Sequence, residues 1–214
     1  MSLELSGTTG VKGVAGSVSA PSIVGDDTNT GISFPSADTI KFSTGGVERM
    51  AITNSGVSGI TAGITMADQW RINATFANNG ANLITSNWER NDTTGFTGIG
   101  SAMTQSSGTF SFPSTGIYYI QFTGRGEANN GARQYAGVYI STGISGTYTT
   151  AADVYSSISA SGYFFACTTS TIFDVTDTST HTVRFYAESG GDCNYHGDTG
   201  SNRNHVTFLR LGDT

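Results

Sequence analysis

The chain has 214 residues, of which only 12% are charged, and its formal net charge is −6. Its eight arginines are scattered singly, so no basic stripe exists to neutralise phosphates, and we expect no nucleic-acid binding. No apolar run approaches the ~20 residues that a membrane-spanning helix needs, so we expect no membrane insertion either. The 29 glycines and three prolines, among many serines and threonines, favour short strands and tight turns over helices.

The N-terminus carries no recognisable secretion signal. The stretch MSLELSGTTG lacks a charged segment followed by an apolar one. The sequence therefore predicts synthesis in a cytoplasm, with release by lysis or by assembly into a particle. The two cysteines, Cys167 and Cys193, lack CxxC spacing, which disfavours a zinc site. A cytoplasmic origin favours free thiols, and a disulfide between them remains the alternative.

The first 63 residues lack Trp and Tyr and differ in texture from the rest of the chain. Residues 1–24 are poor in apolar side chains and predict an extended arm that attaches the protein to a larger assembly. Residues 25–63 predict short strands at Ile32–Phe34, Thr39–Ser43 and Val47–Thr53. So short a segment cannot bury enough apolar area alone, so we expect several chains to share one core in a short stalk or collar.

Residues 64–214 predict an all-β sandwich made of many short aromatic strands. No helical period of useful length is present, although MADQW at 66–70 is compatible with a helix start. The strands expected from alternation and turn signals are Trp70–Phe76, Leu83–Trp88, Thr109–Phe112, Ile117–Arg125, Gln134–Ile140, Ser159–Phe165, Thr168–Val175, His181–Ser189 and His205–Leu211.

The stretch SGTFSFPSTGIYYIQF is the most informative part of this region. Its glycines and proline exclude a helix and predict two strands joined by a tight corner. In the second strand, Tyr118 and its alternate neighbours share one face, and Tyr119 lies on the other. Apolar side chains on both faces predict a strand that is covered twice, once by its own core and once by something else.

The segment from Gly108 to Phe122 resembles the G-x-F-x-x-P-x-x-G-x-Y-x-F core of the C1q/TNF-like jelly roll. Strands at Tyr135–Ile140, His181–Tyr186 and Val206–Leu211 extend the resemblance over about residues 65–214. It implies three jelly rolls around a three-fold axis, and the doubly covered strand then meets neighbouring subunits. The trimer-interface residues that we expect are Tyr118, Tyr119 and Phe208 in the head and Phe34 and Phe42 in the stalk; a monomeric sandwich is the alternative.

A second resemblance lies in the N-terminal part. Residues 27–53, DTNTGISFPSADTIKFSTGGVERMAIT, are similar to a repeat-like segment of tail-fibre and structural proteins of tailed bacteriophages. The resemblance covers about 30 residues and implies a virion origin without fixing a position in the particle.

Catalysis and metal binding find little support. His181, His196 and His205 have no fixed carboxylate partner, and no G-x-S-x-G elbow accompanies the many serines. The stretch 190–198 contains acidic residues, a cysteine and a histidine, but Gly/Asp loops of this kind are usually turns. We therefore expect a non-enzymatic protein with no metal and no cofactor.

Binding to a surface ligand is more plausible. The polar segment Ser189–Asn204 carries Tyr195, His196 and Arg203, and residues 141–157 carry Tyr148 and Tyr155. Loops on a rigid β-scaffold often hold binding sites, and such side chains can stack on host-surface glycans. The alternative is a solvated loop with no ligand.

Taken together, these features predict a short N-terminal β-rich trimerising stalk followed by a C1q/TNF-like jelly-roll sandwich. The expected protein is a homotrimer in a phage virion, joined to other virion proteins through its arm. Its expected role is that of a fibre or fibre tip in host attachment; the alternative is a capsid decoration or cement protein. A non-viral C1q-like binding protein is a third class, which the missing secretion signal argues against.

Overall fold

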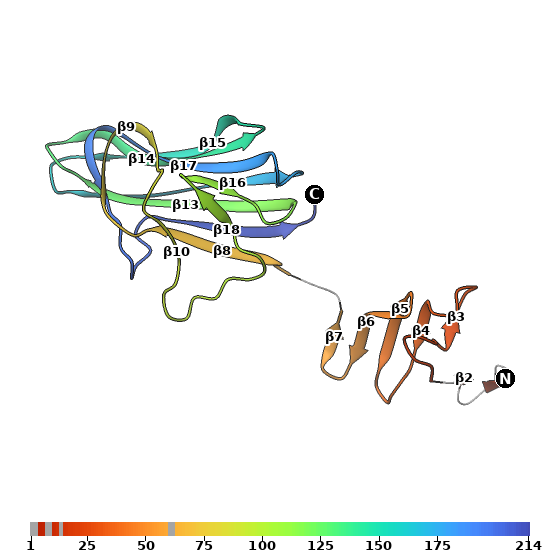
Figure 1. Cartoon of the computed structure of the whole chain (residues 1–214). Helices are drawn as coiled ribbons and strands as arrows, with labels where there is room; N and C mark the ends of the chain where they lie inside the picture. The colour runs from red at the N-terminus through yellow and green to blue at the C-terminus, as the bar shows by residue number, and fades with distance from the viewer. Residues whose placement is uncertain (1–3, 7–9, 13–14, 60–62) are drawn as a thin grey trace. The chain divides into compact units, whose positions relative to one another are not determined.

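The computed structural model describes residues 4–6, 10–12, 15–59 and 63–214, and all of their regular secondary structure is β (Figure 1). The chain divides into two compact units, Met1–Ala62 and Gly63–Thr214, which we call the small unit and the head. This all-β architecture confirms the expected fold class.

The small unit contains a five-stranded antiparallel sheet in the order β3-β4-β5-β6-β7 and a separate hairpin, β1-β2. Residues 15–24 contact this sheet through backbone hydrogen bonds, and their role as an attachment arm stays a prediction. The Phe34 amide donates to the Ala15 carbonyl (2.6 Å), and β3 pairs with β4. The strands are β1 (Glu4–Ser6), β2 (Gly10–Lys12), β3 (Ile23–Val24), β4 (Gly31–Ser33), β5 (Ile40–Thr44), β6 (Val47–Thr53) and β7 (Gly56–Ser58).

The head is a sandwich of two antiparallel layers. The first layer has the order β10-β8-β18-β13-β16, and the second joins β15, β14 and β17 to β9, β12 and β11. The end of β13 also pairs with β17 and links the layers. The strands are β8 (Met66–Ile72), β9 (Phe76–Leu83), β10 (Trp88–Arg90), β11 (Thr104–Ser106), β12 (Thr109–Ser111), β13 (Gly116–Ala128), β14 (Arg133–Ile144), β15 (Thr147–Ile158), β16 (Phe164–Val175), β17 (His181–Tyr195) and β18 (His205–Gly212).

Aromatic rings fill the core between the layers. Alternate residues of β13 and β17 point inward, as the period of two requires. Phe110 lies at the centre and is fully buried. Its ring centroid is 5.0 Å from that of Trp88, 5.3 Å from that of Phe185 and 5.6 Å from that of Phe208. These edge-on and tilted contacts join both layers into one hydrophobic core.

Several expected strands have different bounds. The stretch at 66–70 is part of β8 and not a helix, and β9 begins at Phe76, where one expected strand ended. The two strands expected over 159–175 are one strand, β16. The largest omission is β15, an edge strand with an outward face of Thr, Asp and Tyr that gives no hydrophobic alternation.

The two cysteines lie in the head and are unpaired. Cys167 and Cys193 are both buried, on β16 and β17. Burial raises the pKa of the Cys167 thiol to about 11, because a thiolate is poorly solvated there. The thiol is therefore protonated at neutral pH and chemically unreactive.

Candidate functional site

The outward side of the first layer carries a continuous row of apolar side chains. Tyr119 on β13 lies directly between Ile172 on β16 and Leu209 on β18. Leu209 in turn pairs with Ala67 on β8, which bridges to Ile99. Ile172 is 64% exposed and Ile99 is 48% exposed, so both ends of the row are open to solvent within one chain. The three residues between them are partly exposed. We call these five residues the apolar row.

Two residues expected at a trimer interface belong instead to the core of their own subunit. Tyr118 and Phe208 are fully buried. The Tyr118 hydroxyl donates to the Ser114 carbonyl (2.9 Å), and the Phe208 ring packs on Phe110. Neither side chain is available to another copy, so that expectation is wrong for both. Tyr119 lies on the opposite side of β13, where alternation placed it.

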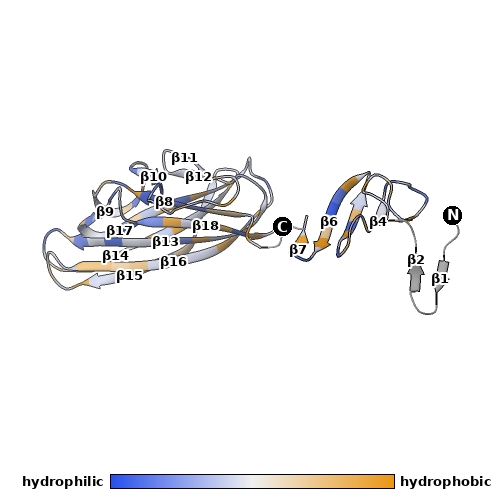
Figure 2. Ribbon diagram, turned by 90° about the horizontal axis from the view of Figure 1, so that it is seen from below, coloured by the Kyte–Doolittle hydropathy of each residue, from blue (hydrophilic) through white to orange (hydrophobic). Residues whose placement is uncertain are grey.

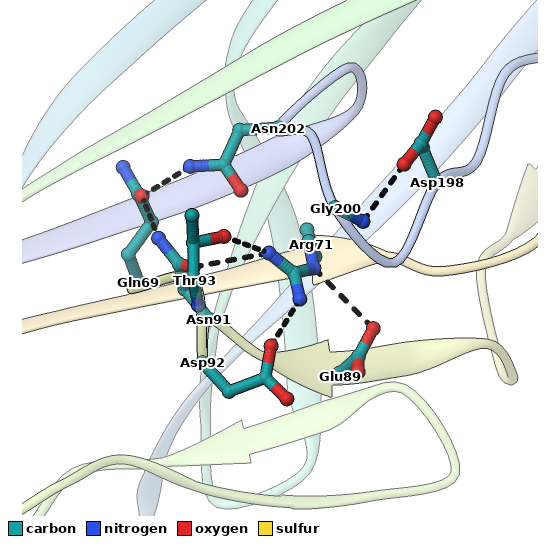
Figure 3. A network of polar contacts seen from close by, with 9 residues as sticks. All are labelled: Gln69, Arg71, Glu89, Asn91, Asp92, Thr93, Asp198, Gly200 and Asn202. Atoms are coloured by element: carbon teal, nitrogen blue, oxygen red, sulfur yellow. Dashed lines mark hydrogen bonds and ion pairs between the residues drawn. The ribbon is translucent and has the colours of Figure 1, made fainter. Parts of the chain in front are cut away.

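A buried polar network closes the same side of the layer next to β10 (Figure 3). The Arg71 guanidinium is fully buried and donates to Asn91 Oδ1 (3.0 Å) and Thr93 Oγ1 (2.7 Å). It also forms ion pairs with Glu89 and Asp92. These contacts hold the segment after β10 against β8. The network therefore has a structural role, since its donors and acceptors are engaged with one another.

The small sheet also has an apolar face. Register pairing aligns Ile23 with Ile32, Ile32 with Phe42, and Phe42 with Met50 on one side. The opposite side is polar and carries the Lys41–Glu48 ion pair (2.6 Å). Figure 2 shows the hydrophobic positions of β6 and β7 in orange. The seven residues that we call the small-sheet face are Ile23, Ile32, Ile40, Phe42, Met50, Ile52 and Val57.

Both aromatic residues expected in the stalk interface are accessible. Phe42 is part of the small-sheet face and is partly exposed. Phe34 follows β4 and is 42% exposed. Among the described residues of the small unit, only Ser33, Ser43 and Ala51 are buried, and the register places them on the side opposite the small-sheet face.

The segment expected as the main receptor loop is shorter and more buried than its composition indicates. β17 continues to Tyr195, whose fully buried hydroxyl donates to the carbonyls of Gly137 (2.7 Å) and Glu188 (2.8 Å). Its expected contact with a receptor is therefore wrong. His196 is also buried, with Nε2 3.7 Å from Glu127 Oε1. Arg203 is the most exposed of the three side chains, at 40%, and it pairs with Asp198 (2.9 Å).

The outward side of the second layer is rich in tyrosine. Cross-strand register places Tyr139 opposite both Tyr186 and Asp153, and places Gly137 opposite Tyr155. The structure thus brings Tyr148 and Tyr155, both expected in a binding surface, onto one sheet face with three further tyrosines that the sequence analysis did not select. We call this surface the tyrosine face: Tyr135, Tyr139, Tyr148, Tyr155 and Tyr186.

Glycines in the underlying strands let these rings lie close to the sheet. A Cβ at Gly143 would be 2.5 Å from the Tyr148 ring, and a Cβ at Gly190 would be 3.1 Å from the Tyr135 ring. A Cβ at Gly137 would likewise meet Tyr155. Each ring therefore occupies the space that a side chain of the neighbouring strand would otherwise fill.

Hydrogen bonds and stacking hold the same rings in place. The Tyr155 hydroxyl donates to Glu188 Oε2 (2.6 Å), and the hydroxyls of Tyr148 and Thr182 are hydrogen-bonded at 2.7 Å. Tyr139 and Tyr186 stack with centroids 4.5 Å apart and an interplanar angle of 8°. Burial and the Glu188 hydrogen bond raise the pKa of Tyr155 well above its ordinary value of 10.0, so its hydroxyl remains a donor.

The residues that make this face gave a weak but readable signal. Tyr135, Gly137 and Tyr139 alternate along one strand and share a face. Glycine inside a strand marks a close approach by another group. The sequence analysis did not predict the strand that pairs with β14 on this face, because β15 has no hydrophobic alternation.

Within the described residues, no group of three or more His, Cys, Asp and Glu side chains is arranged to hold a metal ion. The same residues contain no helix long and apolar enough to cross a membrane.

Comparisons with known proteins identify the fold of the head. No family model matches the sequence, and no curated protein matches it. Among solved structures, Eiger TNF from S. frugiperda aligns with a TM-score of 0.54 at 10% identity, covering 70% of this chain and 94% of that chain. Murine APRIL at pH 5.0 aligns with a TM-score of 0.50 at 11% identity, covering 68% and 98%.

A third match, the PRD1 vertex protein P5, has 15% identity and covers 71% of this chain and all of its own. Its TM-score is 0.44, and we base no argument on it. The two higher-scoring matches each cover more than nine-tenths of the matched chain. The head is a TNF-like jelly roll, as the Gly108–Phe122 motif predicted.

Proposed function

We propose that this protein is a homotrimeric, non-enzymatic component of a bacteriophage virion that attaches the particle to its host. The observation that carries the proposal is that each unit exposes an apolar surface, the apolar row in the head and the small-sheet face in the small unit. Burying one such side chain fully in an interface stabilises the assembly by about 1.5–3 kcal/mol relative to leaving it exposed. Exposed apolar patches of this kind typically mark protein interfaces.

A closed ring of copies explains both surfaces at once. Around a three-fold axis, the row of Tyr119, Leu209 and Ile172 in one head packs against a neighbouring head. The small-sheet face meets its own copies and builds the core that a single sheet lacks. Three-fold symmetry itself comes from the resemblance to C1q/TNF-like jelly rolls.

The virion location rests on residues 27–53, which are similar to segments of phage fibre and structural proteins. Attachment is favoured over other virion roles because the tyrosine face belongs to the second layer. It therefore stays free when the first layer packs against other subunits. A surface of this size and composition is suited to ligand binding.

Oligomeric state tests the trimer directly. In light scattering after size exclusion, we expect the purified chain to have three times its sequence mass of 22.3 kDa. Ile172→Lys introduces three charges beside the axis and should shift the protein toward monomer. Thr150→Lys, a matched change on the exposed outer side of β15, should leave the mass unchanged. A monomeric wild-type protein would contradict the proposal.

A capsid decoration or cement role is the second candidate. It is favoured by the small size of the small unit, whose sheet strands have only two to seven residues and give little reach. Counting copies per particle by quantitative mass spectrometry separates the two. A few to a few tens of copies, with adsorption blocked by the free protein, supports attachment. Hundreds of copies, with fragile capsids when the protein is missing, supports decoration.

A further inference from the structure

We infer that the tyrosine face is a carbohydrate-binding platform, and that its ligands are neutral pyranose glycans of the host surface. This inference rests on the proposed attachment role and names the ligand class of its receptor. It draws on three properties of the face: fixed aromatic rings, a border of hydroxyl and carboxylate groups, and two carboxylates without an ion pair among the described residues.

The rings are fixed before any ligand arrives. Tyr155 is held by Glu188, Tyr148 by Thr182, and the Tyr139–Tyr186 pair by stacking. Tyr135 packs edge-on against Tyr155, with centroids 5.6 Å apart. Tyrosine has few rotatable bonds, and here most of that freedom is already lost in the free protein. Binding therefore costs little side-chain entropy, which matters for a weak, flat contact.

The chemistry of the face matches that of a pyranose ring. A pyranose presents an apolar C–H face, which packs on aromatic rings, and a rim of hydroxyl groups that needs hydrogen-bond partners. The Asp153 carboxylate lies opposite Tyr139 and makes no side-chain hydrogen bond among the described residues. Glu188 uses one oxygen for Tyr155 and has the other available. Gln134, Tyr135, Tyr155 and Glu188 line a shallow hollow of about 500 Å³, within the usual size range of ligand sites.

The charge of the face selects against acidic sugars. Asp153 and Glu188 are its carboxylates, and neither forms an ion pair among the described residues. The nearby cations are already engaged, since Arg133 donates to the carbonyls of Ala132 (2.9 Å) and Asp192 (3.1 Å). The Arg184 guanidinium already lies 3.8 Å from the centre of the Tyr148 ring and donates to Thr109 Oγ1 (3.0 Å). A sialic or uronic acid would bring a third carboxylate close to Asp153 and Glu188. Neutral hexoses avoid the repulsion.

A protein partner fits the face less well. The side chains that surround the rings are small and hydroxylic, such as Ser141, Thr150 and Thr182. Protein interfaces bury a desolvated apolar core, whereas here the polar groups are interleaved with the rings. This composition favours a small ring-shaped ligand, such as a pyranose, that has both an apolar face and polar groups at its edge.

The test uses the full chain and titrates it with neutral oligosaccharides, such as gluco-, galacto- and manno-oligomers, and with sialylated and uronic-acid oligomers of matched length. NMR or calorimetry should detect at least one neutral series with millimolar or better affinity and weaker binding of the acidic series. Tyr155→Ala and Tyr186→Ala should each weaken binding about tenfold or more. Tyr163→Ala is the matched control, because Tyr163 is 60% exposed and lies outside the face. Its affinity should equal that of the wild type.

Some variants could lose binding by unfolding, so thermal midpoints are measured for each, and Tyr155→Phe provides a second probe. This variant keeps the ring, and binding should fall less than with Tyr155→Ala. The inference is overturned if no neutral oligosaccharide binds, if only acidic glycans or a host protein bind, or if Tyr163→Ala has the same effect as Tyr155→Ala. Trimer mass and copy number are measured separately, so the proposed virion role can stand when the glycan inference fails, and the reverse.

Discussion

The small unit and the head are both built from antiparallel strands, but they cover their apolar faces in different ways. The head places a second layer over the first, and Phe110, Phe122 and Phe185 are completely buried. The small unit has a single layer, and Ile23 and Val57 remain more than half exposed. A one-layer sheet cannot bury its apolar face by itself. The number of layers in one chain therefore decides how much of its apolar surface that chain can cover.

The two outward sides of the head differ in a related way. The apolar row crosses four strands of the first layer and offers no charged group. The tyrosine face combines rings with Asp153, Arg184 and Glu188. The first is suited to permanent burial between copies, whereas the second keeps polar groups that water can solvate. One head can therefore assemble through one layer and bind through the other.

The largest expected effect comes from separating the two units and measuring whether each folds by itself. We expect residues 63–214 to fold cooperatively, with a single thermal transition and native near-ultraviolet dichroism. Residues 1–62 alone should show no cooperative transition at low concentration, because their apolar face finds no cover. A cooperative transition of the monomeric 1–62 fragment would contradict the argument.

Within the head, the centre of the core should carry the largest single-residue effect. Phe110→Ala removes a ring that contacts both layers, and we expect a loss of about 3–5 kcal/mol in the free energy of unfolding. Phe164→Ala is the matched control, since Phe164 is 61% exposed. Urea denaturation of the 63–214 fragment measures both, and equal losses would show that the core is not organised around Phe110.

The aromatic core and the layer fold were readable from the sequence, because each depends on local alternation. Phe110, Tyr118 and Phe122 lie at the spacing that a period of two demands, and the Pro-Ser-Thr-Gly corner separates their strands. Tyr118 and Phe208 were misassigned to an interface for a physical reason. Alternation says which residues share a face, but it does not say which face the second layer covers.

Only part of the tyrosine face could be predicted from the sequence. Tyr148 and Tyr155 stood out in a polar segment, but β15 exposes most of its side chains and lacks the apolar alternation of a strand. Tyr186 and Tyr139 become neighbours only through the pairing of β14 with β17, about 47 residues apart in the chain. Tyr195 was misplaced because Gly190 and Gly191 were interpreted as a loop, whereas β17 passes through them with a bulge.

The polar network on the first layer should be the next most sensitive feature. Arg71→Met removes the hydrogen bonds to Asn91 and Thr93 and the ion pairs with Glu89 and Asp92, so we expect a loss of about 2–3 kcal/mol in the free energy of unfolding. Asn91 Oδ1 keeps the Thr93 amide as a donor (3.0 Å). The penalty is limited because the Asp92 side chain is 72% exposed and can be solvated. Arg203→Met, at an exposed ion pair, should cost less than about 1 kcal/mol. Equal effects in urea denaturation would argue against a buried structural role.

A smaller loss of stability is expected from a substitution at Gly143, which lies beneath the Tyr148 ring. Gly143→Ala places a methyl group against the Tyr148 ring and should displace it from Thr182 and Arg184. We expect about 1 kcal/mol of lost stability, from one hydrogen bond and one cation–π contact. Gly212→Ala is the matched control, because a Cβ at Gly212 meets no atom within 4 Å and its φ is outside the left-handed region. Tyrosine fluorescence should change with Gly143→Ala and stay constant with Gly212→Ala.

The smallest expected effect is on the pH dependence of the free energy of unfolding, through His205 on β18. Burial lowers the pKa of His205 below its ordinary value of 6.5, because the charged imidazolium is poorly solvated there, and a hydrogen bond with the Asn202 backbone opposes this only in part. The unfolded chain therefore binds the proton more readily than the folded one. The contribution of neutral His205 to the free energy of unfolding is fully present above pH 6.5. It is lost as the pH falls toward the lowered pKa of the folded state. Urea denaturation from about pH 8 to about pH 5 should show a steeper loss for the wild type than for His205→Gln. Identical profiles would mean that His205 keeps its ordinary pKa in the folded head.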